Sequence, residues 1–288
     1  MKRFIRQMGL VFAGVFLLLA LFDVTYTWII SENSLLGIGK NEKVDYLLLG
    51  DSRSVMLNAD YLSEVTGKKV VNIACDGCSF IDILNMTDYF FKEGNRTDTV
   101  IIQMDPVFGW YMEPHVTFLY YAHLTRQKGI LSPRIPFKYY LENRGKIKFE
   151  KVWKSVSNIL NGETGYKSMD IRNLKPSRFT PVKKFMRDDS KESFRIDRLV
   201  DFKKYLVERG VKDLIVYTAP ILPAWAMYQT DPTSYKNMIR EAGFQYEDLS
   251  NLYKDTVYFR DHLHLNFEKY IEYNRFFAER VMSSSQPR

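Results

Sequence analysis

The sequence predicts an α/β fold, in which a parallel β-sheet is covered by helices. Two observations lead to this class: short apolar runs alternate with amphipathic helical patterns, and glycine or polar turn residues separate them. Strands that alternate with helices form parallel sheets, because a crossover helix returns the chain to the start of the next strand. The composition, with 46% hydrophobic and 26% charged residues, excludes a disordered chain and a polytopic membrane protein.

Five segments have the pattern of buried strands, and four have the pattern of helices. The predicted strands are 44–49, 69–74, 97–103, 213–218 and a short last strand at 256–259. The predicted helices are 58–66, 79–92, 191–208 and 266–282. Ligands of such sheets bind where the strands end, so we expect functional residues in the loops that follow the strands.

Residues 1–31 have the pattern of a transmembrane signal-anchor. Basic residues at positions 2, 3 and 6 precede a long apolar stretch from 8 to 30, which is interrupted once, at Asp23. This length is enough to span a bilayer, and the basic residues predict a cytoplasmic N-terminus with the remaining chain extracytoplasmic. A cleaved signal peptide with its apolar region at 8–22 is an alternative, although a small-residue cleavage site is lacking. A buried helix of a cytosolic domain is the third interpretation.

A polar linker at 32–43 leads into one predicted domain, 44–288, which contains a long insertion at about 106–190. Residues 126–191 hold 17 Lys or Arg against 6 Asp or Glu, an excess of 11 positive charges that accounts for the whole net charge of +7. We expect this insertion to form either a helical cap over the strand ends or an ordinary solvent-exposed addition to the domain. Nucleic acid is not an expected partner, because export would separate the chain from it.

The first chemical motif is Gly50-Asp51-Ser52-Arg53, directly after the first strand. A serine on a tight turn that leaves a parallel strand projects its hydroxyl above the edge of the sheet. A helix beginning just beyond this turn would direct free N–H groups towards a developing oxyanion. The alternative is an ordinary turn, because Gly, Asp and Ser are common turn residues.

The second motif is Asp261-His262-Leu263-His264, before the last predicted helix. A general base needs an imidazole that a carboxylate holds in one tautomer, and the spacing of Asp261 and His264 allows a turn to bring them together. Metal binding and a surface loop are the alternatives. Two histidines without further His or Cys nearby make a poor metal site, so we expect no metal and no cofactor.

These motifs, at the two ends of the predicted domain, resemble those of the SGNH (GDSL-like) hydrolase family over roughly 44–104 and 211–282. The resemblance implies a three-layer α/β/α sandwich of flavodoxin-like type with a parallel five-stranded sheet. It also implies a Ser52 nucleophile, a His264 base and an Asp261 that orients the base. The backbone N–H groups of Ser52 and of Gly77, in the loop after the second strand, would form the oxyanion hole. The alternative for Gly77 is a routine strand-to-helix loop.

One position departs from the family pattern. The asparagine that supplies a side-chain oxyanion donor after the third strand is missing, and Gln103-Met104-Asp105-Pro106 stands there. Membrane-anchored branches that modify cell-envelope polymers are similar in architecture. We therefore expect a serine esterase or deacylase acting on O-acyl groups of envelope glycans or lipids. An O-acyltransferase or D-alanine-transfer-like protein and a catalytically silent binding or assembly factor are the alternatives. Candidate pocket residues are Asp105, Arg53 and Trp110.

Cys75 and Cys78 form a C-x-x-C pattern around Gly77. A local disulfide or two free thiols is the expected state, because nothing else in the chain indicates a thioredoxin-like redox unit.

Overall fold

The computed structural model describes residues 2–33, 41–75, 78, 80–104, 196–223 and 232–283. The insertion predicted at 106–190 lies outside these described residues, as does most of the predicted linker at 32–43. The chain divides into two units, and helix α1 belongs to a different unit from the sheet, so each is described by itself.

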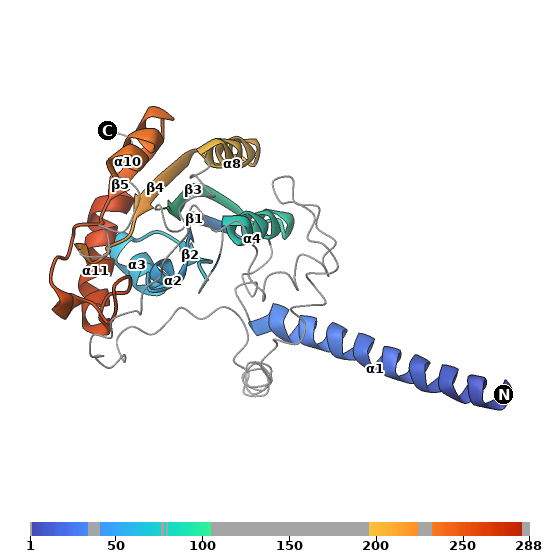
Figure 1. The fold of residues 1–288 in the computed structure, drawn as a ribbon. Helices are drawn as coiled ribbons and strands as arrows, with labels where there is room; N and C mark the ends of the chain where they lie inside the picture. Colours follow the sequence, from blue (N-terminus) through green and yellow to red (C-terminus); the bar gives the residue numbers. More distant parts are fainter. Residues whose placement is uncertain are drawn as a thin grey trace. The chain divides into compact units, whose positions relative to one another are not determined.

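A five-stranded sheet forms the centre of the larger unit (Figure 1). Its order is β2-β1-β3-β4-β5, and every neighbouring pair is parallel, as predicted. This is the strand order of flavodoxin-like sheets. The strands are β1 Lys43–Leu49, β2 Val70–Asn72, β3 Arg96–Gln103, β4 Asp213–Thr218 and β5 Gln245–Asp248.

The fifth strand is not the one expected from the sequence. The segment predicted at 256–259 forms a 3₁₀ turn, η3 Thr256–Tyr258, in which the Asp255 side chain accepts the Val257 N–H. The edge position is instead taken by β5, which carries glutamine, glutamate and aspartate beside a buried Tyr246. Edge strands pair on one side only and often carry charge, so β5 has no apolar run by which to recognise it.

Helices cover both faces of the sheet (Figure 1). Helices α3 Ala59–Thr66 and α11 Tyr270–Phe277 lie on one face, and α4 Phe80–Lys92 and α8 Ile196–Glu208 lie on the other. Helix α10 Pro232–Glu241, which precedes β5, was not predicted. The helix predicted at 266–282 is divided into a 3₁₀ turn η4 Phe267–Lys269, α11 and a π-helical end η5 Ala278–Met282.

Alternating side chains of the central strands supply the two halves of the core. Tyr46 and Leu48 of β1 belong to the cluster that packs with α11, including Phe277. Leu47 and Leu49 are also buried, and they face the other side because successive side chains of a strand alternate. The chemical motifs follow the ends of these buried strands.

Helix α1 Lys2–Asn33 covers nearly all of the segment predicted as a signal-anchor. In the part of the chain that the structure describes, no helix combines the length and apolar character needed to cross a membrane. The predicted transmembrane helix at 1–31 therefore has no support.

Candidate active site

The first part of the site is the turn that follows β1. Gly50 leaves the strand, Asp51 caps the short helix α2 Ser52–Val55, and Ser52 is the first residue of that helix. A Cβ added at Gly50 would lie 2.6 Å from Cβ of Ser54 and 2.8 Å from Cβ of Gln103. Only glycine therefore lets the chain turn this closely beneath Ser52.

The second part is the loop at 260–264, whose flanking residues pair with each other. Phe259 and Leu265 form an antiparallel bridge, and both are buried. Within the loop, the Arg260 N–H donates to the His264 carbonyl at 3.0 Å. The His262 carbonyl accepts the Leu222 N–H at 3.1 Å, which ties the loop to the segment after β4. The loop is thus held at the edge where the strands end.

The structure brings Ser52, His264 and Asp261 into one chain of hydrogen bonds. Ser52 Oγ lies 2.7 Å from His264 Nε2, although the residues are 212 positions apart. His264 Nδ1 lies 2.9 Å from both carboxylate oxygens of Asp261. The side chains of His264 and Asp261 are 18% and 19% exposed, so both are partly buried among the described residues.

The Asp261 carboxylate determines which nitrogen of His264 carries the proton. Burial by itself would raise the pKa of Asp261, but bonds from the His264 ring and from the Leu263 and His264 N–H groups lower it to about 2. An ionised carboxylate only accepts hydrogen bonds, so Nδ1 of a neutral His264 carries the hydrogen. Nε2 is then the acceptor that faces the Ser52 hydroxyl.

Arg53 is buried, with 4% exposure, and its guanidinium turns back onto Asp51. Its Nε and Nη2 donate to the Asp51 carboxylate at 3.2 and 2.7 Å, and its backbone N–H donates to the same group at 2.9 Å. Burial would raise the pKa of Asp51, but Arg53 and the Gln103 side chain hold it below its usual value. Arg53 thus stabilises the turn that carries Ser52.

A buried polar network lies directly behind this turn. Ser54 Oγ donates to Gln103 Oε1 at 2.6 Å and accepts from the Tyr217 hydroxyl at 2.6 Å. Asn72 donates to the carbonyls of Ser54 and Leu57, both at 2.7 Å. These contacts connect the ends of β1, β2, β3 and β4. Sequence reasoning did not assign these roles, and the one available signal was polar Gln103 at the end of an apolar strand.

Asn274 of α11 connects the two halves of the site and is fully buried. Its Oδ1 accepts the Asn58 N–H at 2.7 Å, and its Nδ2 donates to the Met56 carbonyl at 3.0 Å. The segment after Ser52 is thereby bonded to the helix after His264. A single asparagine within a helix carries no sequence signal for this role.

Three predicted site residues, Gly77, Asp105 and Trp110, lie outside the described residues. The backbone N–H of Ser52 stands at the first position of α2, and a helix leaves its first N–H groups without intrahelical acceptors. The described residues contain no group of three His, Cys, Asp or Glu side chains arranged to hold a metal ion.

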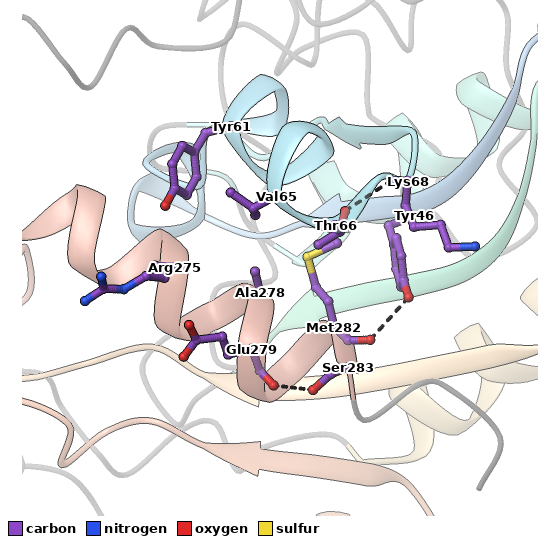
Figure 2. Close-up of a pocket in the computed structure, with 10 residues that line it drawn as sticks. All are labelled: Tyr46, Tyr61, Val65, Thr66, Lys68, Arg275, Ala278, Glu279, Met282 and Ser283. Atoms are coloured by element: carbon purple, nitrogen blue, oxygen red, sulfur yellow. Dashed lines mark hydrogen bonds between the residues drawn. The ribbon is translucent and has the colours of Figure 1, made fainter.

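A separate cavity of about 410 Å³ lies between α3 and the C-terminal helical segment (Figure 2). Tyr46 in β1 and Lys68, just before β2, are among its lining residues. Ser52 follows the opposite end of β1, so this cavity is not part of the Ser52 site.

Comparisons with known proteins leave the family open. No protein-family model matches the sequence, and no curated protein sequence matches it. Similar solved structures include a "putative acylhydrolase" from Bacteroides fragilis, with 9% identity, a TM-score of 0.39, and coverage of 85% of this chain and 88% of that one. Another is a "putative platelet activating factor" from Streptococcus pneumoniae, with 12% identity, a TM-score of 0.40, and coverage of 95% and 98%. These TM-scores are too low to carry an argument about function.

Proposed function

We propose that the protein is a serine-dependent acyl-ester hydrolase that uses Ser52, His264 and Asp261. The observation that carries the proposal is the 2.7 Å contact between Ser52 Oγ and Nε2 of His264, whose Nδ1 lies 2.9 Å from the Asp261 carboxylate. A serine hydroxyl becomes an effective nucleophile when such a base accepts its proton. We propose O-acyl groups of envelope glycans or lipids as the substrate class.

In the proposed reaction, Ser52 Oγ attacks the ester carbonyl while His264 Nε2 takes the hydroxyl proton. Asp261 stabilises the imidazolium that forms, and the N–H of Ser52 donates to the oxyanion together with that of Gly77. His264 then gives the proton to the leaving alcohol as the ester C–O bond breaks. Water, activated by the same imidazole, hydrolyses the acyl-enzyme and regenerates Ser52.

The test compares Ser52→Ala with the unchanged protein on p-nitrophenyl acetate. We expect kcat/KM to fall by about 10³-fold or more, because a nucleophilic mechanism has no substitute for the hydroxyl. A fluorophosphonate probe should label the unchanged protein and fail to label Ser52→Ala. Equal turnover by the two proteins would refute the proposal.

His264→Gln and His262→Gln form a matched pair for the base. The two histidines stand in the same loop, and it is Nε2 of His264 that lies 2.7 Å from Ser52 Oγ. We expect a large loss for His264→Gln and a small effect for His262→Gln. A glycan alcohol added to the assay separates hydrolysis from transfer, because a transferase would form the acylated alcohol and release little free acid.

The compartment is part of the proposal, and we place the site outside the cytoplasm. The Cys75–Cys78 disulfide supports this placement, because disulfides persist in oxidising compartments. Fractionation of cells that produce the full chain tests it, and the same experiment distinguishes membrane-bound from released protein. Recovery of the chain in the cytosol with both thiols free would contradict it.

A further inference from the structure

The side chain of Gln103, the last residue of β3, packs against the turn that carries Ser52. It is fully buried, and its Oε1 accepts the Ser54 hydroxyl at 2.6 Å. A Cβ added at Gly50 would lie 2.8 Å from Cβ of Gln103, so the strand end and the turn are in close contact. The chain after Gln103 is fixed as well, because the Met104 N–H donates to a carbonyl of β4 at 2.8 Å.

The amide of Gln103 makes bonds on both sides of Ser52 in the sequence. Besides accepting from Ser54, it hydrogen-bonds to the Asp51 carboxylate. The pKa of Asp51 is held below its usual value, so this group is ionised and only accepts hydrogen bonds. The donor to Asp51 is therefore the amide nitrogen of Gln103. The reverse orientation of the amide would set its oxygen against the carboxylate.

Asp51 and Ser54 together define the first turn of α2, of which Ser52 is the first residue. The Asp51 side chain caps this helix by accepting the Arg53 N–H, and the Asp51 carbonyl accepts the Ser54 N–H at 2.9 Å. Ser54 is fully buried and so has no freedom to move into solvent. The two residues that Gln103 holds therefore set the orientation of the turn between them.

We propose that Gln103 is a positioning residue for Ser52, and that its bonds to the flanking residues keep Ser52 Oγ within reach of His264 Nε2. The inference rests on the proposed hydrolase function and adds a residue that acts through Asp51 and Ser54. The amide is fully buried and both of its ends are bonded within the fold, so it is not an oxyanion donor. Its effect is on the geometry of attack, where a displacement of about 1 Å can lower the rate about 10²-fold.

The experiment compares Gln103→Met and Thr218→Val with the unchanged full chain on p-nitrophenyl acetate. Methionine has a similar volume but cannot replace the two bonds of the amide. Thr218 is the matched control, because it is also buried at a strand end, and its hydroxyl donates to the Met104 carbonyl at 2.9 Å. We expect Gln103→Met to lower kcat about 10-fold or more with KM within about 2-fold. Thr218→Val should keep kcat within about 2-fold, since it leaves the bonds of Gln103 in place.

Gln103→Glu gives a pH profile that a loss of stability alone would not give. The introduced carboxyl group, when protonated, can accept from Ser54 and donate to Asp51 as the amide does. When ionised it faces Asp51 as a second anion, and Arg53 is already paired with Asp51. The ratio of its kcat to that of the unchanged protein should therefore be highest at the lowest pH and fall as the pH rises. Circular dichroism at each pH verifies that both proteins are folded.

Full kcat in folded Gln103→Met, or an equal loss of kcat in Thr218→Val, would overturn the positioning role and leave the hydrolase function intact. If Gln103→Met does not fold, Gln103→Glu decides, and a kcat ratio that stays near one across the pH range would overturn the role. Equal activity of the unchanged protein and Ser52→Ala would refute the hydrolase function, and the positioning role with it.

Discussion

At the scale of single residues, Asp261 both shapes its own loop and bonds to the His264 ring. Its carboxylate accepts two backbone N–H bonds from within its own loop before it bonds to the His264 ring. The same side chain therefore shapes the loop and selects the tautomer of a neutral His264. The three-residue spacing of Asp261 and His264 allows one carboxylate to make both kinds of bond.

The lowered pKa of Asp261 makes a prediction about acid stability. The pKa is about 2 in the folded protein against an ordinary value of 3.8. The ionised group therefore stabilises the folded state fully above pH 3.8, and this contribution is lost as the pH falls through about 2. We expect Asp261→Asn to lower the free energy of unfolding at neutral pH, on the order of 1 kcal/mol because the carboxylate is partly exposed.

Urea unfolding of both proteins at several pH values checks this prediction. The difference in unfolding free energy between the unchanged protein and Asp261→Asn should shrink steadily below pH 3.8. A difference that stays constant to about pH 2 would contradict the assigned pKa.

At the scale of elements, the site depends on how α11 is attached to the serine turn. Helix α11 follows the His264 loop, and its Asn274 side chain is bonded to backbone groups on either side of Leu57. These bonds fix the segment that follows Ser52 relative to the helix that follows His264. Asn274 is in this sense a positioning residue.

Replacement of Asn274 by leucine should destabilise the fold. Leucine has a similar volume but leaves the buried Asn58 N–H and Met56 carbonyl without their partner, at about 1–3 kcal/mol each. We expect the free energy of unfolding to fall by about 2–4 kcal/mol, measured by urea titration.

The matched control is Asn237→Leu on α10, where the side chain is exposed. It should change the free energy of unfolding by no more than about 0.5 kcal/mol. Similar losses for both variants would show that the buried hydrogen bonds of Asn274 are not the cause.

At the scale of the whole molecule, the site exists only in the folded sheet domain. Ser52 and His264 are 212 residues apart in the sequence, and the contacts that join their segments include the direct Ser52–His264 bond and the bond from the Asn58 N–H to Asn274 of α11. Local structure in either segment cannot assemble the three side chains.

Activity and global structure should therefore be lost together. In a urea titration followed by esterase turnover and by far-UV circular dichroism, we expect coincident midpoints, because small domains unfold cooperatively. Loss of turnover at a clearly lower urea concentration than the loss of the circular dichroism signal would show that the Ser52 and His264 segments separate before the sheet unfolds.

Four of the five strands were predictable because they are apolar runs, and a strand buried on both faces needs such a run. β5 was not, because this edge strand is polar apart from Tyr246, whereas β2 at the other edge keeps two valines. The turn at Gly50–Arg53 and the contact between Asp261 and His264 were predictable for a related reason, since both depend on residues close in sequence. Helix α1 was predictable as a helix, although its predicted membrane span has no support.

The amino-acid sequence by itself determined the α/β class, the parallel sheet and the residue types at the ends of its strands, because these follow from local periodicity and turn chemistry. Only the tertiary structure decided that Ser52 Oγ meets Nε2 of His264, that Arg53 turns inward to Asp51, and that Asn72 and Asn274 join the loops. Those contacts depend on strand order and on burial of polar groups between distant segments. A buried polar group needs a partner, and only the completed fold determines which partner it finds.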